Sequence, residues 1–263
     1  MHISTKKYLL SKRIDGFFIS INKAYQFVIQ FFKQAFKPPF HFTEVINQCF
    51  EIGLRALPLI TLTGFIIGIV FTKQSRPSLE EFGATSWLPS LIGIAILKAL
   101  GPLVTALICA GKVGSSIGAE LGSMKVTEQI DAMEVSAVNP FKYLVVTRVT
   151  ATMISVPILS FYCVVVGLLG SYLNVHAEEA SSFQTFFRNS FSSIHFLDYF
   201  TSIIKSVVFG FTIGIVGTYK GFYASQGTRG VGKAANQAVV MAMFLIFMEE
   251  MLIVQVANWI RYF

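Results

Sequence analysis

Five long apolar runs constrain this chain more than any other feature of its sequence. Each run reaches or exceeds the roughly 20 residues that an α-helix needs to cross the hydrocarbon core of a bilayer. A segment in lipid must satisfy its own backbone hydrogen bonds, so we predict that every run is a helix. The expected spans are 52–72, 87–110, 143–173, 199–219 and 236–260.

The overall composition supports the same class. Of the 263 residues, 54% are hydrophobic and 13% are charged, against roughly a quarter charged in an average soluble domain. These fractions exclude a disordered chain, a collagen-like fibre and a disulfide scaffold, and they argue against an ordinary soluble enzyme. We therefore expect an all-α polytopic membrane protein with five transmembrane helices.

Residues 1–40 precede the first span and have a different pattern. Polar residues recur every three to four positions between aromatic and aliphatic residues, until Pro38 and Pro39 end the pattern. The pattern predicts an N-terminal amphipathic helix in the membrane interface, with a helix packed on a partner as the alternative. Two units follow from this division, an interfacial helix over 1–40 and a transmembrane domain over 41–263.

The lysines and arginines outside the spans predict the orientation. Most of them fall in 1–48, 111–142 and 220–235, and few fall in the other connections. Because basic residues accumulate on the cytoplasmic side, we expect the N-terminus in the cytoplasm and the C-terminus outside.

Glycines recur at spacings that let helices approach closely in lipid. Such a spacing serves packing within one chain or dimerisation, and the sequence leaves both possibilities open. The glycines concerned are Gly64 and Gly68, Gly114, Gly118 and Gly122, and Gly210 and Gly214.

Three charged residues lie near the middle of predicted spans, where charge is costly and marks function by default. Lys98 and Glu250 are at similar estimated depths, so we predict that Glu249 or Glu250 neutralises Lys98. The group is then either a structural ion pair or a polar patch in a substrate cavity. Lys205 and Arg55 lie nearer the helix ends and are expected to extend toward the membrane surface.

Catalytic and metal-binding motifs are missing from the sequence. Gly111 and Lys112 resemble the end of a P-loop, but Ala106 and Val113 replace the glycine and hydroxyl residue that a P-loop requires. The cysteines have no CxxC spacing and the histidines form no i,i+4 pair. We expect no enzyme activity, no metal and no cofactor in this chain.

The connection 111–142 carries a second prediction. Thr127 is expected to cap a short helix over 127–137, with Ile130 and Met133 on one face. Acidic residues on the other face suit docking to a cytoplasmic partner, and a solvated loop is the alternative. The acidic residues are Glu128, Asp131 and Glu134.

One segment resembles a known family. The run from Leu97 to Val135, which reads LKALGPLVTALICAGKVGSSIGAELGSMKVTEQIDAMEV, is similar to the signature of the MlaE (YrbE) permeases of ABC transporters. Two departures stand out, because Lys98-Ala99 replaces an Arg-Glu pair and Lys112 replaces an arginine. The matching positions are Gly101, Pro102, Ala110, Gly111, Gly114, Ser115, Ala119, Glu120, Gly122, Met124, Glu128, Gln129, Ala132 and Met133.

The resemblance implies a function and a set of partners. It implies a homodimeric permease in the bacterial inner membrane that moves glycerophospholipids toward the outer membrane and so maintains outer-membrane lipid asymmetry. A cytoplasmic MlaF-like ATPase would hold ATP and magnesium, an MlaD-like MCE-domain protein would lie outside, and an MlaB-like STAS-domain protein is often present. A proton-coupled secondary transporter and a non-transporting scaffold of an envelope complex are the alternatives.

The resemblance and the charge pattern together imply two groups of site residues. One group would form a lipid cavity at a dimer interface, with Phe71, Leu79 and Phe82 around the tails and Gln74, Lys98, Ala99, Glu249 and Glu250 near the headgroup. The other group would couple the permease to the ATPase, and comprises Glu120, Lys125, Thr127, Glu128, Gln129, Asp131, Met133 and Glu134.

Overall fold

The protein is a bundle of helices. The computed structural model describes the backbone of residues 2–179 and 181–261, and the side chains of 18–179 and 181–260. Helices make up the regular structure of these residues, which contain no strand. Five helical stretches in this part of the chain are long and apolar enough to cross a membrane, which confirms the predicted fold class. They are Phe42–Glu81, Thr85–Val126, Phe141–Glu179, Phe196–Phe222 and Thr228–Ile260.

Every helical stretch extends beyond the apolar run that predicted it. The first stretch is 40 residues long, although its apolar run covers 52–72. The backbone hydrogen bonds of a helix need no apolar side chains, so polar turns continue each helix past the hydrophobic region. The single helices are α1 (His2–Ala35), α2 (Phe42–Glu81), α6 (Gln129–Val135), α8 (Phe183–Ser192), α9 (Phe196–Phe222) and α10 (Thr228–Arg261).

The second and third stretches contain π-helical turns. Such turns carry an extra residue, are rare, and often occur at functional sites. One of them, η2, ends two residues before Pro102, which has no backbone N–H and so costs a regular α-helix one hydrogen bond. The second stretch consists of η1 (Thr85–Trp87), α3 (Leu88–Ala95), η2 (Ile96–Leu100), α4 (Gly101–Cys109), η3 (Ala110–Gly114) and α5 (Ser115–Val126), and the third of η4 (Phe141–Val146) and α7 (Thr147–Glu179).

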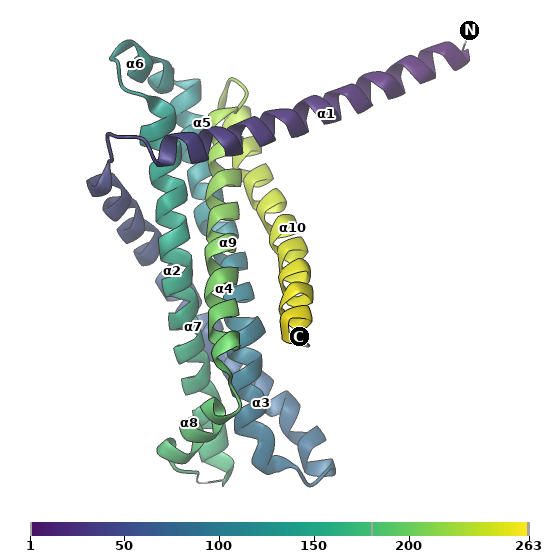
Figure 1. Cartoon of the computed structure of the whole chain (residues 1–263), viewed down its shortest axis with the longest axis vertical. Helices are drawn as coiled ribbons and strands as arrows, with labels where there is room; N and C mark the ends of the chain where they lie inside the picture. The colour runs from purple at the N-terminus through teal and green to yellow at the C-terminus, as the bar shows by residue number, and fades with distance from the viewer. Residues whose placement is uncertain (1, 180, 262–263) are drawn as a thin grey trace.

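Close packing around α7 and α9 builds the core. α7 packs against α2 and α9, while α10 packs against α5 and α9. Buried side chains such as Ile60, Val149, Phe209 and Ile213 fill the space between these helices. The bundle is elongated, with α6 and α1 at one end and α3 and α8 at the other (Figure 1).

The glycines at helix-packing spacing make close approaches inside this single chain. A Cβ on Gly68 would collide with the carbonyl of Gly167, and one on Gly210 would lie 3.0 Å from the Cα of Met153. The other glycines have similar neighbours: Gly64 lies by Cys163, Gly114 by Ile213, Gly118 by Ala238, Gly122 by Ala224 and Gly214 by Val149. These seven positions therefore serve contacts within the bundle.

Helix α1 crosses one end of the bundle and extends away from it (Figure 1). Phe27 and Phe31 are buried against the bundle, where the ring of Phe27 meets that of Phe141 with centroids 4.9 Å apart. Other aromatic residues of α1, including Tyr25 and Phe36, remain exposed. Part of the described amphipathic face therefore packs on the protein, and a position of the remainder in the membrane interface stays a prediction.

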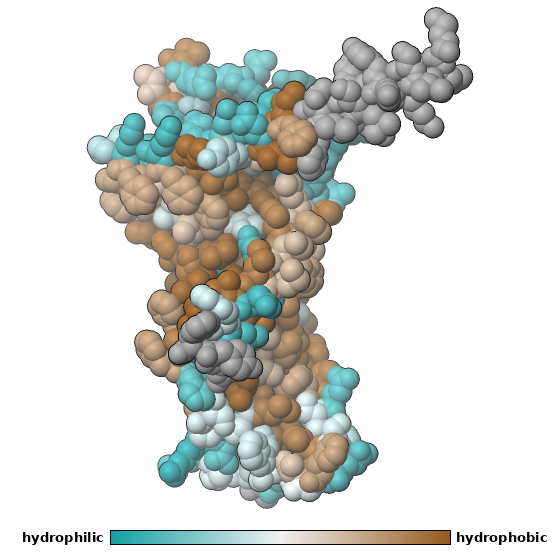
Figure 2. Space-filling model, turned by 45° about the vertical axis from the view of Figure 1, so that its right-hand side comes forward, coloured by the Kyte–Doolittle hydropathy of each residue, from teal (hydrophilic) through white to brown (hydrophobic). Residues whose placement is uncertain are grey.

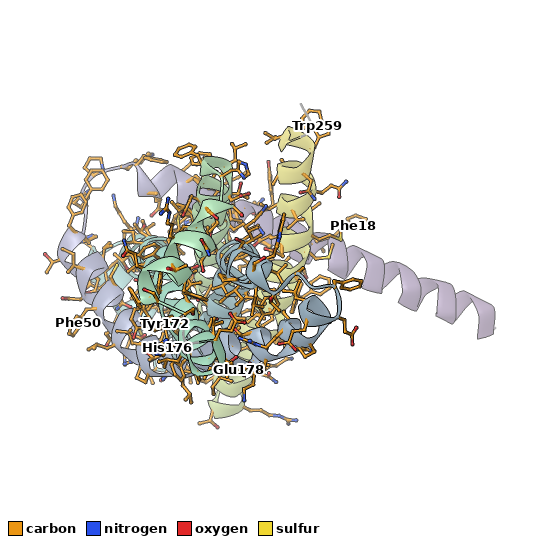
Figure 3. All side chains as sticks on the ribbon, turned by 90° about the horizontal axis from the view of Figure 1, so that it is seen from below. Phe18, Phe50, Tyr172, His176, Glu178 and Trp259 are labelled. Carbon is orange, nitrogen blue, oxygen red and sulfur yellow. The ribbon has the colours of Figure 1, made fainter. Side chains whose placement is uncertain are left out.

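The outer surface matches a bilayer environment. Brown, hydrophobic residues dominate the middle of the face in Figure 2, with hydrophilic residues at both ends. Phe50 on α2 and Trp259 on α10 are exposed and point away from the bundle (Figure 3). Exposed apolar side chains of this kind are expected where lipid replaces water as the surrounding medium.

Candidate functional site

A cavity of about 400 Å³ lies where α3 and η2, the first half of α9 and the last third of α10 meet. Its polar side is formed by charged and hydroxyl residues, and the remaining wall is largely apolar. The polar residues include Lys98, Asp198, Ser202, Lys205 and Glu250, and the apolar ones include Ile94, Ala95, Ala99, Leu197, Val254 and Ala257.

The first ion pair of the cavity joins Lys98 to Asp198. The Nζ atom of Lys98 lies 2.8 Å from Oδ1 of Asp198, and the side chain of Lys98 is 33% exposed. Asp198 is in the first turn of α9, where its Oδ2 also accepts a hydrogen bond from the backbone N–H of His195 at 3.1 Å. This carboxylate therefore caps a helix N-terminus, a position that favours negative charge.

The second ion pair is deeper and joins Lys205 to Glu250. Their Nζ and Oε1 atoms are 2.6 Å apart, and the side chain of Lys205 is only 4% exposed. The same ammonium donates to the backbone carbonyl of Lys98 at 3.2 Å. In a regular helix that carbonyl would accept the N–H of residue 102, which is a proline and has none. The break at Pro102 thus supplies a second acceptor for Lys205.

The predicted pairing of Lys98 with Glu249 or Glu250 is wrong. Glu250 pairs with Lys205, and Glu249 accepts a hydrogen bond from Oγ1 of Thr212 at 2.5 Å. The expectation that Lys205 extends toward the membrane surface is wrong for the same reason, since its ammonium is buried in this contact. Counting residues along a helix estimated the depth of each charge, but the rotation of α10 against α9 decided which charges meet.

Asp198 was not among the predicted site residues. It stands three residues after His195, at the start of the fourth span, which is the spacing of a carboxylate that caps the first turn. Ala99 also leaves Lys98 without an acid beside it in the sequence. Together these two signals could have identified Asp198 as a partner.

Of the residues predicted to surround a lipid, Glu249 and four residues between Phe71 and Phe82 do not line this cavity. Phe71 and Leu79 pack against a cluster that includes Leu88 and Phe186, while Gln74 is exposed and Phe82 is 82% exposed. All four belong to α2 or the residue after it, and α2 packs on α7 rather than on α10. The predicted roles of Phe71, Leu79 and Phe82 with lipid tails and of Gln74 with the headgroup remain predictions, outside this cavity.

The far end of α2 is instead tied to α7 by charge. Arg76, which is nearly buried, lies 2.8 Å from Oε2 of Glu178 and 2.7 Å from Oε1 of Glu179. Tyr172 and His176 stack beside them with ring centroids 5.4 Å apart, and Figure 3 shows these two residues and Glu178 together at this end of the molecule.

The predicted coupling helix is present but shorter than expected. α6 covers Gln129–Val135 rather than 127–137, and Glu128 before it has a left-handed backbone with φ of 59°. Thr127 does not cap α6, since its hydroxyl donates back to the carbonyl of Ser123 at 2.9 Å. α5 continues through Val126, so Thr127 is the end of one helix and not the beginning of the next.

The faces of α6 differ as the sequence predicts. Ile130 is buried and Met133 packs against the core, whereas Glu128, Gln129 and Glu134 are exposed. Asp131 is also exposed and forms an ion pair with Lys125 at 2.8 Å, which ties α6 to α5.

Glu120 is exposed, and an ion pair joins it to the bundle. Its Oε1 atom lies 2.7 Å from a guanidinium nitrogen of Arg148, whose side chain is 4% exposed. Arg148 also donates to the carbonyl of Leu144 at 3.2 Å. This pair connects α5, which leads to α6, with the start of α7.

Comparison with known proteins gives a consistent result. The family model described as Permease MlaE matches residues 45–256. A probable ABC transporter permease protein of Rickettsia bellii is 34% identical over 247 residues, covering 94% of this chain and 95% of that protein. The intermembrane phospholipid transport system permease protein MlaE of Haemophilus influenzae is 32% identical over 209 residues, covering 78% and 79%. The chloroplastic protein TRIGALACTOSYLDIACYLGLYCEROL 1 of Arabidopsis thaliana is 30% identical over 214 residues, covering 81% and 61%.

Proposed function

This chain belongs to the MlaE family of ABC-transporter permeases, and we propose on that premise that it moves glycerophospholipids between the inner membrane and an MCE-protein path to the outer membrane. It is the non-catalytic permease subunit of such a transporter. The observation that carries the choice of substrate is a largely apolar cavity whose polar side holds a partly exposed ammonium, Lys98.

The two ion pairs of the cavity suit different tasks. Lys98 is one-third exposed, so a phosphate oxygen can approach its ammonium and compete with Asp198. Lys205 is almost fully buried, and its pair with Glu250 holds α9 against α10. The apolar residues beside Lys98 would contact the first part of the acyl chains. The site therefore offers one exchangeable cation next to apolar surface, which is the chemistry of a phospholipid headgroup and its tails.

Transport also requires that the cavity change its affinity for lipid. We place the docking of an MlaF-like ATPase, which would hold ATP and magnesium, on the exposed acidic face of α6. α5 directly precedes α6 in the chain and packs on α9 and α10, which wall the cavity. Closure of the ATPase would then move α5 and alter the cavity.

The remaining partners and the orientation complete the proposal. Two copies of the chain would form the permease, an MlaD-like MCE protein would receive lipid outside, and an MlaB-like STAS protein would bind the ATPase. The N-terminus and α6 would face the cytoplasm, as the lysines and arginines predict. Such a system would maintain outer-membrane lipid asymmetry.

Lipid transfer in vesicles tests the substrate site. The permease, ATPase and MCE protein are reconstituted, and ATP-driven phospholipid transfer is normalised to the amount of folded permease. We expect Lys98→Ala to lower transfer at least tenfold (~1.4 kcal/mol), because the headgroup loses its cation. Lys73→Ala removes an exposed lysine outside the cavity and should have no effect. Unchanged normalised transfer in Lys98→Ala would exclude this cavity as the headgroup site.

A further inference from the structure

A second cavity, of about 460 Å³, lies at the other end of the bundle, where the chain turns from α1 into α2. We call it the elbow cavity. The segment that follows α6 closes its far side. Its polar lining comes from Gln34, Lys37, His41, Asn139 and Lys142.

The charge of the elbow cavity is not balanced. Lys142 is only 7% exposed, donates to the carbonyl of Lys37 and lies 5.5 Å from the centroid of the Phe40 ring. None of the ion pairs between described side chains includes Lys142, Lys37 or His41. A buried cation without an anion is costly, so a nearly buried lysine of this kind indicates a missing negative partner.

The carboxylates on neighbouring elements do not supply that partner. Glu44, in the first turn of α2, accepts a hydrogen bond from Nε2 of Gln48 at 2.9 Å, and Glu134 of α6 lines an adjacent pocket. Neither lines the elbow cavity.

Two further groups add to the chemistry of the elbow cavity. α2 begins at Phe42, and the side chain of His41 before it forms no capping hydrogen bond with the first turn, so this positive helix end faces the cavity rim uncapped. The Oε1 atom of Gln34 is buried without a donor. A ligand that carries a phosphate and also a hydroxyl or ammonium donor would satisfy both the cations and this amide.

An apolar track leads away from the elbow cavity along α2. Phe42, Ile46 and Phe50 follow one another at i,i+4 spacing, and each is about two-thirds exposed. Acyl chains attached to a phosphate in the cavity could lie along these three residues. A free phosphate ion has no apolar groups that could contact these residues.

We propose that the elbow cavity binds the headgroup of an anionic phospholipid that is not transported. Phosphatidylglycerol fits the donors and acceptors, because it presents a phosphate to Lys37 and Lys142 and a hydroxyl to Gln34. The bound lipid fastens α1 to α2 and to the start of the third span, at the end of the bundle that carries α6. This site goes beyond the proposed transport function and does not depend on it.

Fluorescence quenching by brominated lipids tests the elbow site. Phe40→Trp places a reporter over Lys142, in a background in which Trp87→Phe and Trp259→Phe remove the two native tryptophans. The protein is reconstituted in phosphatidylcholine vesicles that contain either brominated phosphatidylglycerol or brominated phosphatidylcholine. We expect stronger quenching by phosphatidylglycerol, and Lys37→Gln should reduce its relative association constant about fivefold, because the bound phosphate loses one of its two cations.

The controls separate this site from general surface charge and from a free anion site. Lys33→Gln, one turn away on α1 and outside the cavity, should leave the preference within about twofold. Lys142→Met should abolish the preference. If the Lys142→Met protein does not fold, Lys37→Gln still tests the proposal, because Lys37 is exposed. An unchanged preference in Lys37→Gln, or displacement of the lipid by millimolar inorganic phosphate, would overturn the proposal.

Discussion

At the scale of single residues, two lysines in one cavity differ in what their charges can do. Lys98 is partly exposed and has one carboxylate partner, whereas Lys205 is buried and contacts both a carboxylate and a backbone carbonyl. A substrate anion can reach the first ammonium and has little access to the second. The same charge therefore serves recognition at one position and helix packing at the other.

The buried pair gives a prediction about stability. Lys205→Met should destabilise the folded protein by about 3–5 kcal/mol, because it leaves Glu250 buried without a cation. The double variant Lys205→Met/Glu250→Met should recover most of that loss, since it removes both charges together. Denaturant unfolding in mild detergent measures both. If the double variant is as unstable as the single one, packing around Lys205 matters more than its charge.

At the scale of helices, the contact between α2 and α7 depends on the absence of side chains. A Cβ on Gly68 would collide with the carbonyl of Gly167 and would lie 3.0 Å from Oγ of Ser171, which itself donates to the carbonyl of Gly68. Backbone atoms cannot move aside as a flexible side chain can, so the two helices must separate to admit even a methyl group.

A matched pair of substitutions on α2 tests this contact. Gly68→Ala should lower the free energy of unfolding by about 1–3 kcal/mol, the usual cost of overpacking. Gly53→Ala, on the same helix with open space around it, should leave stability unchanged or raise it. Thermal unfolding in detergent compares the two proteins, and equal stability would contradict the close approach of α2 to α7.

The exposed face of α6 gives a second prediction at this scale. Glu128→Lys/Glu134→Lys should release the ATPase while the permease stays inserted, because both side chains are exposed and form no described ion pair. Glu81→Lys, at the other end of the bundle, is the control. Co-purification of the ATPase with each variant is the measurement. Retention of the ATPase at the normal yield would show that α6 is not the docking element.

At the scale of the whole molecule, the described residues contain five helical stretches long and apolar enough to cross a membrane. Five crossings would place the two ends of the chain on opposite sides, which is the orientation that the lysines and arginines predict. The elbow cavity and α6 lie at one end of the bundle, whereas the cavity around Lys98 is walled by α3, the first half of α9 and the last third of α10, nearer the other end (Figure 1). The proposed ATPase docking site on α6 and the proposed substrate cavity are therefore separated along the membrane normal. The helices α5, α9 and α10 connect them.

Orientation is tested with accessibility tags. A cysteine tag added at the N-terminus should be protected from a membrane-impermeant reagent in intact cells, and a tag after Phe263 should react. The expectation rests on the excess of lysine and arginine in 1–48, 111–142 and 220–235. Two tags with the same reactivity would contradict five membrane crossings.

The sequence by itself determined the class of this protein, the presence of five spans and the family signature, because hydropathy, span length and motif spacing are local properties of the chain. It also singled out Lys98 and Glu250, which line the same cavity. The tertiary structure decided their partners, since Asp198 and Lys205 come from a third helix, α9, which packs closely on α7 through glycines such as Gly210. Depth in a membrane follows from counting residues, but lateral neighbours follow only from how the helices pack.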